Sequence, residues 1–378
     1  MKENTFGFVL HPLDPRRDAG RKYPFLVHLP VWLIEFLSVF APPILLSEVR
    51  GIRSPANGRD LRGWFVACPL SARMMLKLPT GIVYHKIVQS AQLAQSLGAR
   101  IVGLGAFTSV VGDGGVSVAR KLRVPVTTGN SYTIATAIHA VRLSARLAGI
   151  DLSEATVAVV GASGSIGAIC ARLMAAESGA MLLIGRRLPA LQEIAERASE
   201  SGAHSVRIGT DVSLISEAQI VIAVTSSLSA IIDTQHLGPG AIVCDVARPR
   251  DVARRVTCER PDVHVIEGGA VSVPGDVDFR FDFGFPAGMA YACMAETMAL
   301  ALEGRFESFS LGKQLELDRV AEIDRLASRH GFRVSGLRNL DRVIQAPALD
   351  GAGIGAVRVA NVPVRPSKPG VARLPGIA

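Results

Sequence analysis

Short apolar runs alternate with stretches of helical spacing through the middle of the chain. The runs are rich in β-branched residues and predict buried strands, whereas apolar residues recurring every three or four positions predict helices. The predicted strands span residues 156–160, 181–185, 205–208, 220–224, 241–245 and 263–266. The predicted helices between them span residues 166–177, 190–199 and 213–218. This alternation is typical of a parallel, doubly wound α/β sheet.

The segments on either side of this region have other patterns. Before it, helices are predicted over residues 82–97 and 131–147, and strands over residues 101–104 and 124–128. After it, we expect an apolar helix over residues 287–303 and an amphipathic helix over residues 314–330, each closed by a glycine. The chain beyond residue 346 is rich in Pro, Gly and Val and lacks periodicity, which predicts a disordered tail.

One stretch, residues 25–49, is apolar enough to raise the question of a membrane. Pro30, Pro42 and Pro43 divide it into pieces shorter than the about 20 residues that a transmembrane helix needs. We therefore expect a buried or surface helix over residues 31–40, and treat the stretch as a candidate for peripheral membrane contact. The charged residues that precede it do not resemble a signal peptide, so a cytoplasmic location is expected.

Composition and charge narrow the function classes. Hydrophobic residues make up 49% of the chain and charged residues 20%, which is the composition of a protein with a packed core. The formal charge of +8 favours anionic partners, but no nucleic-acid-binding motif accompanies it. The five cysteines are widely spaced and odd in number, so neither a disulfide framework nor a zinc site is expected.

The first predicted strand of the central region runs directly into a glycine loop, GASGSIG at residues 161–167. Gly161 would make the tight turn, Gly164 would let the backbone approach a pyrophosphate, and Gly167 would let helix and strand pack closely. The free N–H groups of the following helix would face the phosphates. The cofactor contacts expected in this loop are Gly161, Ser163, Gly164, Ser165, Ile166 and Gly167.

The residues after the later strands indicate which dinucleotide binds. Arg186 and Arg187 stand where an NAD-specific site usually carries an acidic ribose ligand, and guanidinium groups suit a 2′-phosphate instead. NADPH is therefore the expected cofactor. Further cofactor contacts are expected at Thr225, Ser226, Gly268 and Gly269, with ordinary turn chemistry as the alternative for these four.

Together these patterns predict an α/β protein with a Rossmann domain. Residues 1–130 are expected to form an N-terminal α/β domain for substrate, and residues 131–285 the doubly wound Rossmann domain that binds NADPH. Residues 286–345 are expected to form C-terminal helices packed on the cleft, and residues 346–378 the tail.

Cys293 is the residue in the C-terminal segment with nucleophilic chemistry. By composition it is a small apolar residue on an apolar helix, and a buried inert thiol is the usual fate of such a position. Its place near the start of that helix favours a thiolate instead. Glu296, one turn later, either orients a partner or disfavours the thiolate by like charge.

Several short sequence motifs follow one another along the chain. They are LGAFTS at residues 104–109, TTGN at 127–130, TVAVVGA at 156–162, GG at 268–269, ACMAE at 292–296, EG at 303–304 and RHGF at 329–332. In these motifs and their order, over about residues 50–335, the chain resembles the long-chain acyl-[acyl-carrier-protein] reductases of cyanobacteria.

The resemblance implies reduction of a fatty acyl thioester to a fatty aldehyde by NADPH, with Cys293 as the nucleophile that carries the acyl group. The thioester would be borne by an acidic acyl carrier protein or by CoA, and residues 25–49 either line an acyl groove or touch a membrane. A developing oxyanion needs hydrogen-bond donors. The candidates are Thr108, Ser109, Thr128 and Asn130, for which turn bonding and helix capping are the alternative.

Two other functions remain open at this stage. A shikimate- or quinate-type NADP dehydrogenase also places a small α/β domain before a Rossmann domain, and relies on a Lys–Asp pair, for which Lys77 and Lys86 are the available lysines. A non-catalytic NADPH-binding protein would keep the glycine loop and have no use for Cys293.

Overall fold

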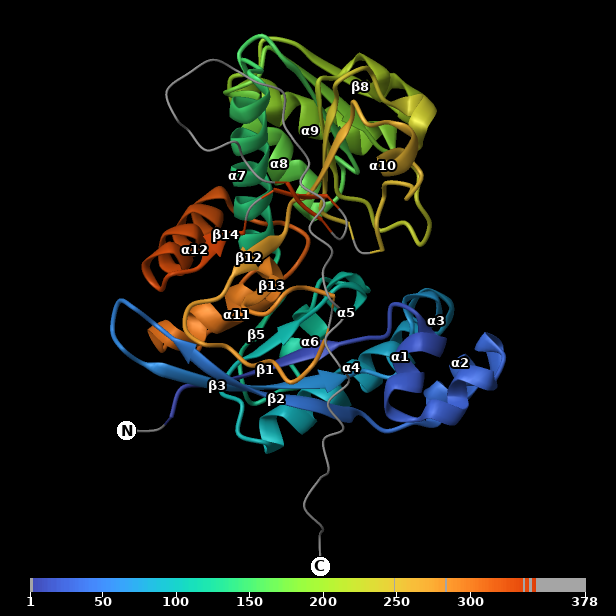
Figure 1. Cartoon of the computed structure of the whole chain (residues 1–378), viewed down its shortest axis with the longest axis vertical. Coiled ribbons are helices and arrows are strands. Elements are labelled where there is room, and N and C mark those ends of the chain that lie inside the picture. Colours follow the sequence, from blue (N-terminus) through green and yellow to red (C-terminus); the bar gives the residue numbers. More distant parts are fainter. Residues whose placement is uncertain (1–2, 248, 283, 336, 340–341, 345–378) are drawn as a thin grey trace, which may run out of the picture.

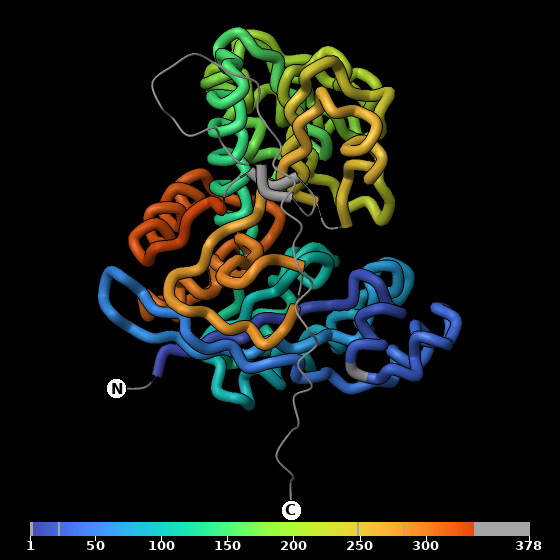
Figure 2. Tube along the Cα trace, in the orientation of Figure 1, coloured from blue at the N-terminus to red at the C-terminus, as the bar shows by residue number. Residues whose placement is uncertain are grey.

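The computed structural model describes residues 3–247, 249–282, 284–335, 337–339 and 342–344, so the predicted tail lies outside the described residues. Two α/β bodies are stacked one above the other, and helices from the second half of the chain fill the space between them (Figures 1 and 2). The predicted α/β class is confirmed.

The N-terminal body is built on a five-stranded sheet of order β2-β3-β1-β4-β5. All neighbouring strands are parallel except β2 and β3. The strands are β1 (Thr5–Leu10), β2 (Ile44–Arg53), β3 (Asp60–Ala67), β4 (Val102–Leu104) and β5 (Val126–Thr127). The helices are α1 (Pro15–Lys22), η1 (Pro24–His28), α2 (Val31–Phe40), α3 (Ala72–Lys77), α4 (Thr80–Ser96), α5 (Phe107–Val110) and α6 (Val116–Ala119).

The second body is a six-stranded parallel sheet of order β11-β10-β9-β6-β7-β8, the Rossmann order. Its strands are β6 (Thr156–Val160), β7 (Ala180–Ile184), β8 (Val206–Gly209), β9 (Ile220–Ala223), β10 (Ile242–Asp245) and β11 (His264–Glu267). The connecting helices are α8 (Ser165–Ala175), α9 (Leu188–Glu200), η2 (Val212–Glu217), η3 (Thr234–His236) and α10 (Val256–Glu259). All six predicted strands are present, and the helix expected over residues 213–218 is a 3-10 helix.

Among the described residues up to 335, the chain crosses between the two bodies twice. The first crossing is α7 (Asn130–Ala148), which begins beside β5 and runs up against the Rossmann sheet. The second is Gly268–Gly269, which leads from β11 back into a three-stranded sheet of order β13-β12-β14. The remaining elements are β12 (Ala270–Ser272), β13 (Met289–Tyr291), α11 (Ala292–Glu303), α12 (Leu317–Arg329), β14 (Arg333–Val334), β15 (Leu337–Asn339) and β16 (Arg342–Ile344).

The helix predicted over residues 287–303 is wrong in its first turn. Gly288 has a φ of +80°, which ends any helix there, and Met289–Tyr291 pairs antiparallel with β12. The helix α11 therefore begins at Ala292, and Cys293 is its second residue, which places it even closer to the helix start than predicted.

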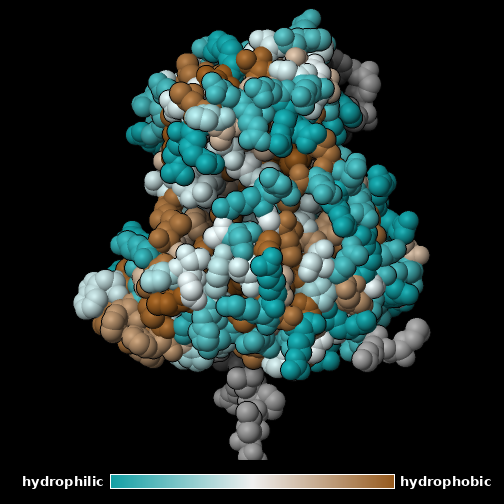
Figure 3. Space-filling view, turned by 180° about the vertical axis from the view of Figure 1, so that it is seen from behind, coloured by the Kyte–Doolittle hydropathy of each residue, from teal (hydrophilic) through white to brown (hydrophobic). Residues whose placement is uncertain are grey.

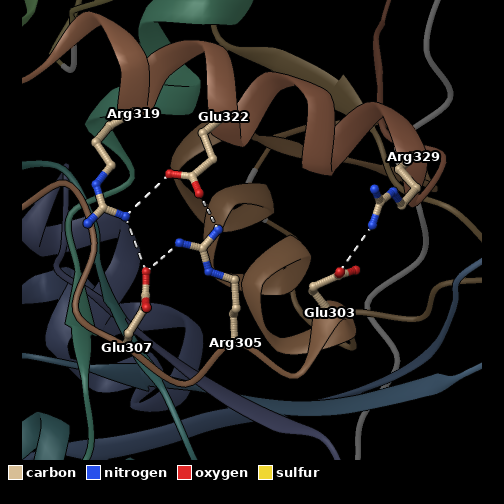
Figure 4. Close-up of polar contacts among 6 residues, drawn as sticks. All are labelled: Glu303, Arg305, Glu307, Arg319, Glu322 and Arg329. Carbon is tan, nitrogen blue, oxygen red and sulfur yellow. Dashed lines mark hydrogen bonds and ion pairs between the residues drawn. The ribbon is translucent and has the colours of Figure 1, made fainter.

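An ion-pair network fastens α12 to the segment that follows α11 (Figure 4). Arg305 pairs with Glu322 at 2.7 Å and with Glu307 at 2.5 Å, and Arg319 pairs with the same two carboxylates at 3.3 and 3.2 Å. Because several charges share partners, the network orders the segment better than isolated surface pairs do. This segment leads to Ser310, which contacts the start of α7.

Among the described residues, no helix combines the length and the apolar character needed to cross a bilayer. The expected domain limits at residues 130/131 and 285/286 stay predictions. In the structure, α7 belongs to both bodies, because it starts beside the N-terminal sheet and ends beside the Rossmann sheet.

Candidate active site

The glycine loop lies where β6 ends and α8 begins. Gly161 has a φ of +89°, and a Cβ on Gly167 would lie 2.3 Å from the carbonyl oxygen of Gly161. Both glycines are therefore required by the tight turn and by the close approach of α8 to the strand. No side chain caps α8, so its first N–H groups are available to an anion. Of the predicted contacts here, Gly161, Ser163, Gly164, Ser165 and Ile166 line the central cavity.

The two arginines lie at the carboxyl end of β7, next to the glycine loop. Arg186 and Arg187 both line the same cavity as Ser163. Arg187 also precedes the first residue of α9. The residues present fit a dinucleotide, because an open helix start and two arginines line one cavity.

The loop after β9 is held by a buried aspartate that the sequence analysis did not single out. Asp251 is fully buried, and its carboxylate accepts hydrogen bonds from the N–H and the hydroxyl of Thr225. Burial raises the pKa of Asp251 to about 6, with the Asp245 charge adding to the effect. Thr225 and Ser226 line the cavity, so Asp251 fixes the backbone of this cofactor loop.

Gly268 and Gly269 have different surroundings. A Cβ on Gly268 would lie 2.5 Å from the sulfur of Cys244, so this glycine is required by packing below the cavity wall. Gly269 lines the cavity and has open space beside it. Its carbonyl oxygen accepts a hydrogen bond from the N–H of Ala292 at 2.8 Å, which places the start of α11 at the second crossing.

Cys293 lies between the two crossings. A Cβ on Gly129, the residue that precedes α7, would lie 2.2 Å from the Cα of Cys293 and 2.3 Å from its Cβ. Cys293 is half-buried and lines the cavity. The starts of α7 and α11 therefore converge beside the thiol, and both helix dipoles favour negative charge there.

Glu296 joins the two helix starts from inside. It is fully buried, and its carboxylate accepts a hydrogen bond from the N–H of Tyr132 at 2.9 Å and another from the hydroxyl of Thr127. Burial raises the pKa of Glu296, and the hydrogen bonds from Thr127 and Tyr132 oppose that shift. The carboxylate thus satisfies an N–H group at the start of α7 that has no partner within the helix, which makes Glu296 a positioning residue.

Only some of the predicted oxyanion donors line the cavity. Ser109, Thr128 and Asn130 line the cavity, whereas Thr108 does not. The hydroxyls of Thr108 and Ser109 donate to the carbonyl oxygens of Gly105 and Ala106 at 2.7 and 2.6 Å, and the hydroxyl of Thr128 donates to the carbonyl oxygen of Ser310. The geometry therefore favours Asn130 and backbone N–H groups as donors, and gives Thr108 a turn-stabilising role.

His11 is a cavity residue that the sequence offered no motif to find. Burial lowers its pKa to about 4, so the ring is neutral near pH 7. Its Nε2 accepts from the N–H of Phe107 at 3.1 Å, and its Nδ1 donates to the carbonyl oxygen of Pro12. The ring holds the turn at Ala106, whose φ of +47° is unusual for a residue with a side chain.

One cavity of about 3550 Å³ connects the cavity-lining residues named above. It extends from the glycine loop past Cys293 to the segment of α1, η1 and α2. At that far end its walls include the apolar residues Leu10, Leu26, Ile34, Leu46, Phe279 and Phe281, together with charged residues such as Arg17, Arg21 and Asp282.

Comparison with known proteins agrees with this description. Residues 142–267 match the family model of shikimate / quinate 5-dehydrogenase, which is the Rossmann part of the chain. Over 345 residues, 87% of this chain and 98% of the relative, the chain is 27% identical to long-chain acyl-[acyl-carrier-protein] reductase of Synechococcus elongatus.

A second relative is longer. Over 286 residues, or 74% of this chain, the sequence is 35% identical to aminotransferase PigE of a Serratia strain, and the chain spans about 33% of that protein's length. Among solved structures, glutamyl-tRNA reductase from Methanopyrus kandleri aligns over 68% of this chain and 55% of its own, with 19% identity and a TM-score of 0.30. A likeness this low does not indicate function.

The Rossmann order, the open glycine loop and the sequence relatives place the chain in a class, the NAD(P)-dependent oxidoreductases. The relatives further support a reductase.

Proposed function

We propose that this protein reduces a fatty acyl thioester to an aldehyde, using NADPH and an acyl-cysteine intermediate on Cys293. The observation that carries the proposal is the position of that thiol. It lies at the start of α11, half-buried, in the same cavity as the glycine loop. Cys68 also lines this cavity, but its thiol is fully buried, whereas Cys293 is half-buried.

The acyl-transfer step needs little beyond a positioned thiolate. The sulfur of Cys293 attacks the thioester carbonyl, a new carbon–sulfur bond forms, and the carrier leaves as a thiol after taking up a proton. The Asn130 side chain lines the cavity and is a candidate donor for the oxyanion, whereas the N–H groups of Ser131 and Tyr132 already donate to Ser310 and Glu296. The apolar end of the cavity accommodates the acyl chain, and Glu296 keeps the two helix starts in register.

The glycine loop, Arg186 and Arg187 would hold NADPH, which supplies the hydride that converts the acyl-cysteine to aldehyde and restores the Cys293 thiolate. The protein's part in this second step is to keep the acyl carbonyl fixed beside the cofactor and to limit the access of water. Without the hydride the acyl-enzyme should therefore accumulate.

Mass spectrometry of the intact protein tests this prediction. Wild type incubated with an acyl-CoA and no NADPH should gain the mass of one acyl chain, and addition of NADPH should release aldehyde detectable by gas chromatography. Cys293→Ala should show neither, whereas Cys258→Ala, which changes an exposed thiol away from the cavity, should behave as wild type. An adduct of equal yield on Cys293→Ala would exclude the mechanism.

The preference for NADPH is tested separately. Arg186→Asp should raise the KM for NADPH at least tenfold and leave that for NADH little changed, because the variant removes a cation and adds repulsion toward a 2′-phosphate. Arg120→Asp, an equal charge change at an exposed site away from the cavity, is the control. Equal KM values for NADPH in Arg186→Asp and wild type would remove the assignment.

The shikimate-type alternative has less support from the site. Neither Lys77 nor Lys86 lines the cavity, and the ammonium group of Lys86 donates to the carbonyl oxygen of Ala41 at 2.8 Å. Reduction of dehydroshikimate by Cys293→Ala at the wild-type rate would favour that alternative over a thioester reductase.

A further inference from the structure

An apolar surface protrudes from the end of the N-terminal body opposite β5. It consists of Phe25 from η1 and Trp32, Phe36 and Phe40 from α2, which are 65, 68, 56 and 72% exposed. We call these four residues the aromatic patch. Figure 3 shows apolar side chains of this segment gathered at the lower left of the molecule, on a projecting part of the surface.

The patch is one continuous face and not a scatter of single residues. Residues 32, 36 and 40 are spaced four apart, so they lie along one side of α2. The rings of Phe36 and Phe40 touch, with centroids 5.5 Å apart. The opposite side of α2 is the buried one and carries Ile34 and Glu35. Soluble monomers rarely leave several adjacent aromatic side chains in water, so such a surface indicates an interaction site.

Exposed cations lie on α1 and α3, the helices next to α2. Arg16 and Arg17 are exposed on α1, and Arg73 and Lys77 are exposed on α3. The segment of residues 68–96, which contains α3 and α4, has no Asp or Glu. The helices are neighbours, because α1 packs on α2 and the Ser71 hydroxyl before α3 donates to Glu35 of α2 at 2.7 Å. A protruding aromatic face with basic residues beside it complements an anionic lipid surface.

The other side of the same segment faces the cavity. Pro24, Leu26, Ile34 and Leu37 of η1 and α2 line its apolar end. The segment is therefore a wall one helix thick between the aromatic patch and the space where an apolar substrate would lie. A convex patch joined to an apolar cavity favours a lipid bilayer over a protein partner, since a protein partner needs a surface of complementary shape.

We propose that η1 and α2 dock the protein on an anionic membrane surface. The aromatic patch enters the interface between headgroups and acyl chains, and Arg16, Arg17, Arg73 and Lys77 lie against the lipid phosphates. The docked orientation brings the apolar end of the cavity to the bilayer, from which apolar molecules can be exchanged without crossing water. The docking does not depend on which thioester or ketone the enzyme reduces.

The protein contains its own reporter for this docking. Of its two tryptophans, Trp32 lies in the aromatic patch, whereas Trp64 is buried at 6% exposure. Vesicles of phosphatidylcholine with one third phosphatidylglycerol should shift Trp32 fluorescence to the blue and should carry the protein into the pellet on sedimentation. Pure phosphatidylcholine vesicles, or 0.5 M salt, should reduce binding several-fold, because the headgroup attraction is lost or screened.

Matched variants test whether vesicle binding depends on the aromatic patch or on exposed apolar residues in general. Phe36→Ser/Phe40→Ser keeps Trp32 and should lower the vesicle-bound fraction at least tenfold. The control Leu143→Ser/Leu188→Ser removes two exposed leucines from other faces and should bind as wild type does. Circular dichroism checks that both doubles fold.

Any one of four results would overturn the proposal. Three of them are no blue shift with anionic vesicles, equal binding to vesicles of both compositions, and an equal loss of vesicle binding in the two double variants. The fourth is a blue shift caused by purified acidic acyl carrier protein and not by vesicles, which would make the surface a protein interface. NADPH consumption with a water-soluble thioester, measured without vesicles, shows independently whether the proposed reaction stands.

Discussion

At the scale of single residues, the contact between Gly129 and Cys293 determines where the thiol lies. Gly129 has a φ of +74°, and the absence of a side chain lets the backbone of α11 approach within van der Waals distance. The glycine is thus required twice, by its backbone conformation and by the space that Cys293 occupies.

Gly129→Ala should fold but lose at least nine-tenths of its turnover, because the added methyl group displaces Cys293 from the start of α7. Gly149→Ala is the matched control. It lies at the other end of α7 with a φ of +68° and nothing within 4 Å of the added Cβ. It should cost about 1–2 kcal/mol in unfolding free energy from backbone strain and leave kcat unchanged. Equal kcat values for the two variants would show that the contact does not position the thiol.

Asp251 gives a prediction about pH. Its pKa of about 6 lies above the value of about 3.9 for an aspartate in an unfolded chain, so the native state binds this proton more tightly. The stability that follows is complete below about pH 4 and is lost as the pH rises through 6. Asp251→Asn has no proton to lose. Between pH 5 and 7.5, wild type should therefore lose about 1 kcal/mol of unfolding free energy relative to the variant, measured by urea denaturation.

A wild-type-to-variant difference that stays constant between pH 5 and 7.5 would mean that the Asp251 carboxylate is charged throughout this range. The unfolding midpoint of Asp211→Asn, measured at the same two pH values, serves as the control. Hydrogen bonds from Ser213 keep the pKa of Asp211 below its usual value, so that carboxylate is already ionised across the range.

At the scale of elements, α7 and α11 act as one unit because Glu296 of α11 accepts a hydrogen bond from the N–H of Tyr132 in α7. Glu296→Gln should lower the free energy of unfolding by about 1–3 kcal/mol, since the amide nitrogen cannot accept one of the two hydrogen bonds and leaves a buried donor without a partner. The exposed Glu200→Gln at the end of α9 should change stability by less than about 0.5 kcal/mol. Alkylation of Cys293 should also slow in Glu296→Gln and not in Glu200→Gln.

The Rossmann strands could be predicted because each is a short β-branched run bordered by turns, and the sheet buries them on both faces. The strand β1 was missed. Its apolar run is only six residues long, lies between charged residues at the terminus, and gains its partners from β3 and β4, which are distant in sequence. The local pattern also predicted that the helix starts at residue 287, whereas α11 starts at residue 292. Residues 289–291 form the strand β13 instead, and this strand depends on its pairing with β12.

Some residues of the candidate site could be predicted and others could not, again because a local pattern does not indicate partners that are distant in sequence. The glycine loop and the two arginines follow their strands directly, so spacing along the chain locates them. Glu296, Asp251 and His11 act through partners that are 26 or more residues away, and no local pattern indicates such pairs.

At the scale of the whole molecule, the cofactor loop and the thiol share one cavity. Bound NADP⁺ should therefore slow alkylation of Cys293 several-fold, because it occupies part of the path to the sulfur. Cys258 is exposed outside the cavity and should react at the same rate with or without NADP⁺. Cys68 lines the cavity, but burial raises its pKa to about 11, so it should remain unmodified near pH 7. Peptide mass spectrometry measures all three rates, and an unchanged rate at Cys293 would place the dinucleotide elsewhere.

The two crossings of the chain have a mechanical consequence. Rotation of the Rossmann body against the N-terminal body would bend the chain at Gly129 and at Gly268–Gly269, its crossings before residue 335, and both places touch the start of α11. Points close to a hinge axis move least when the bodies open. The walls of the cavity can thus swing apart to admit a bulky substrate while Cys293, seated near the pivot, stays almost still.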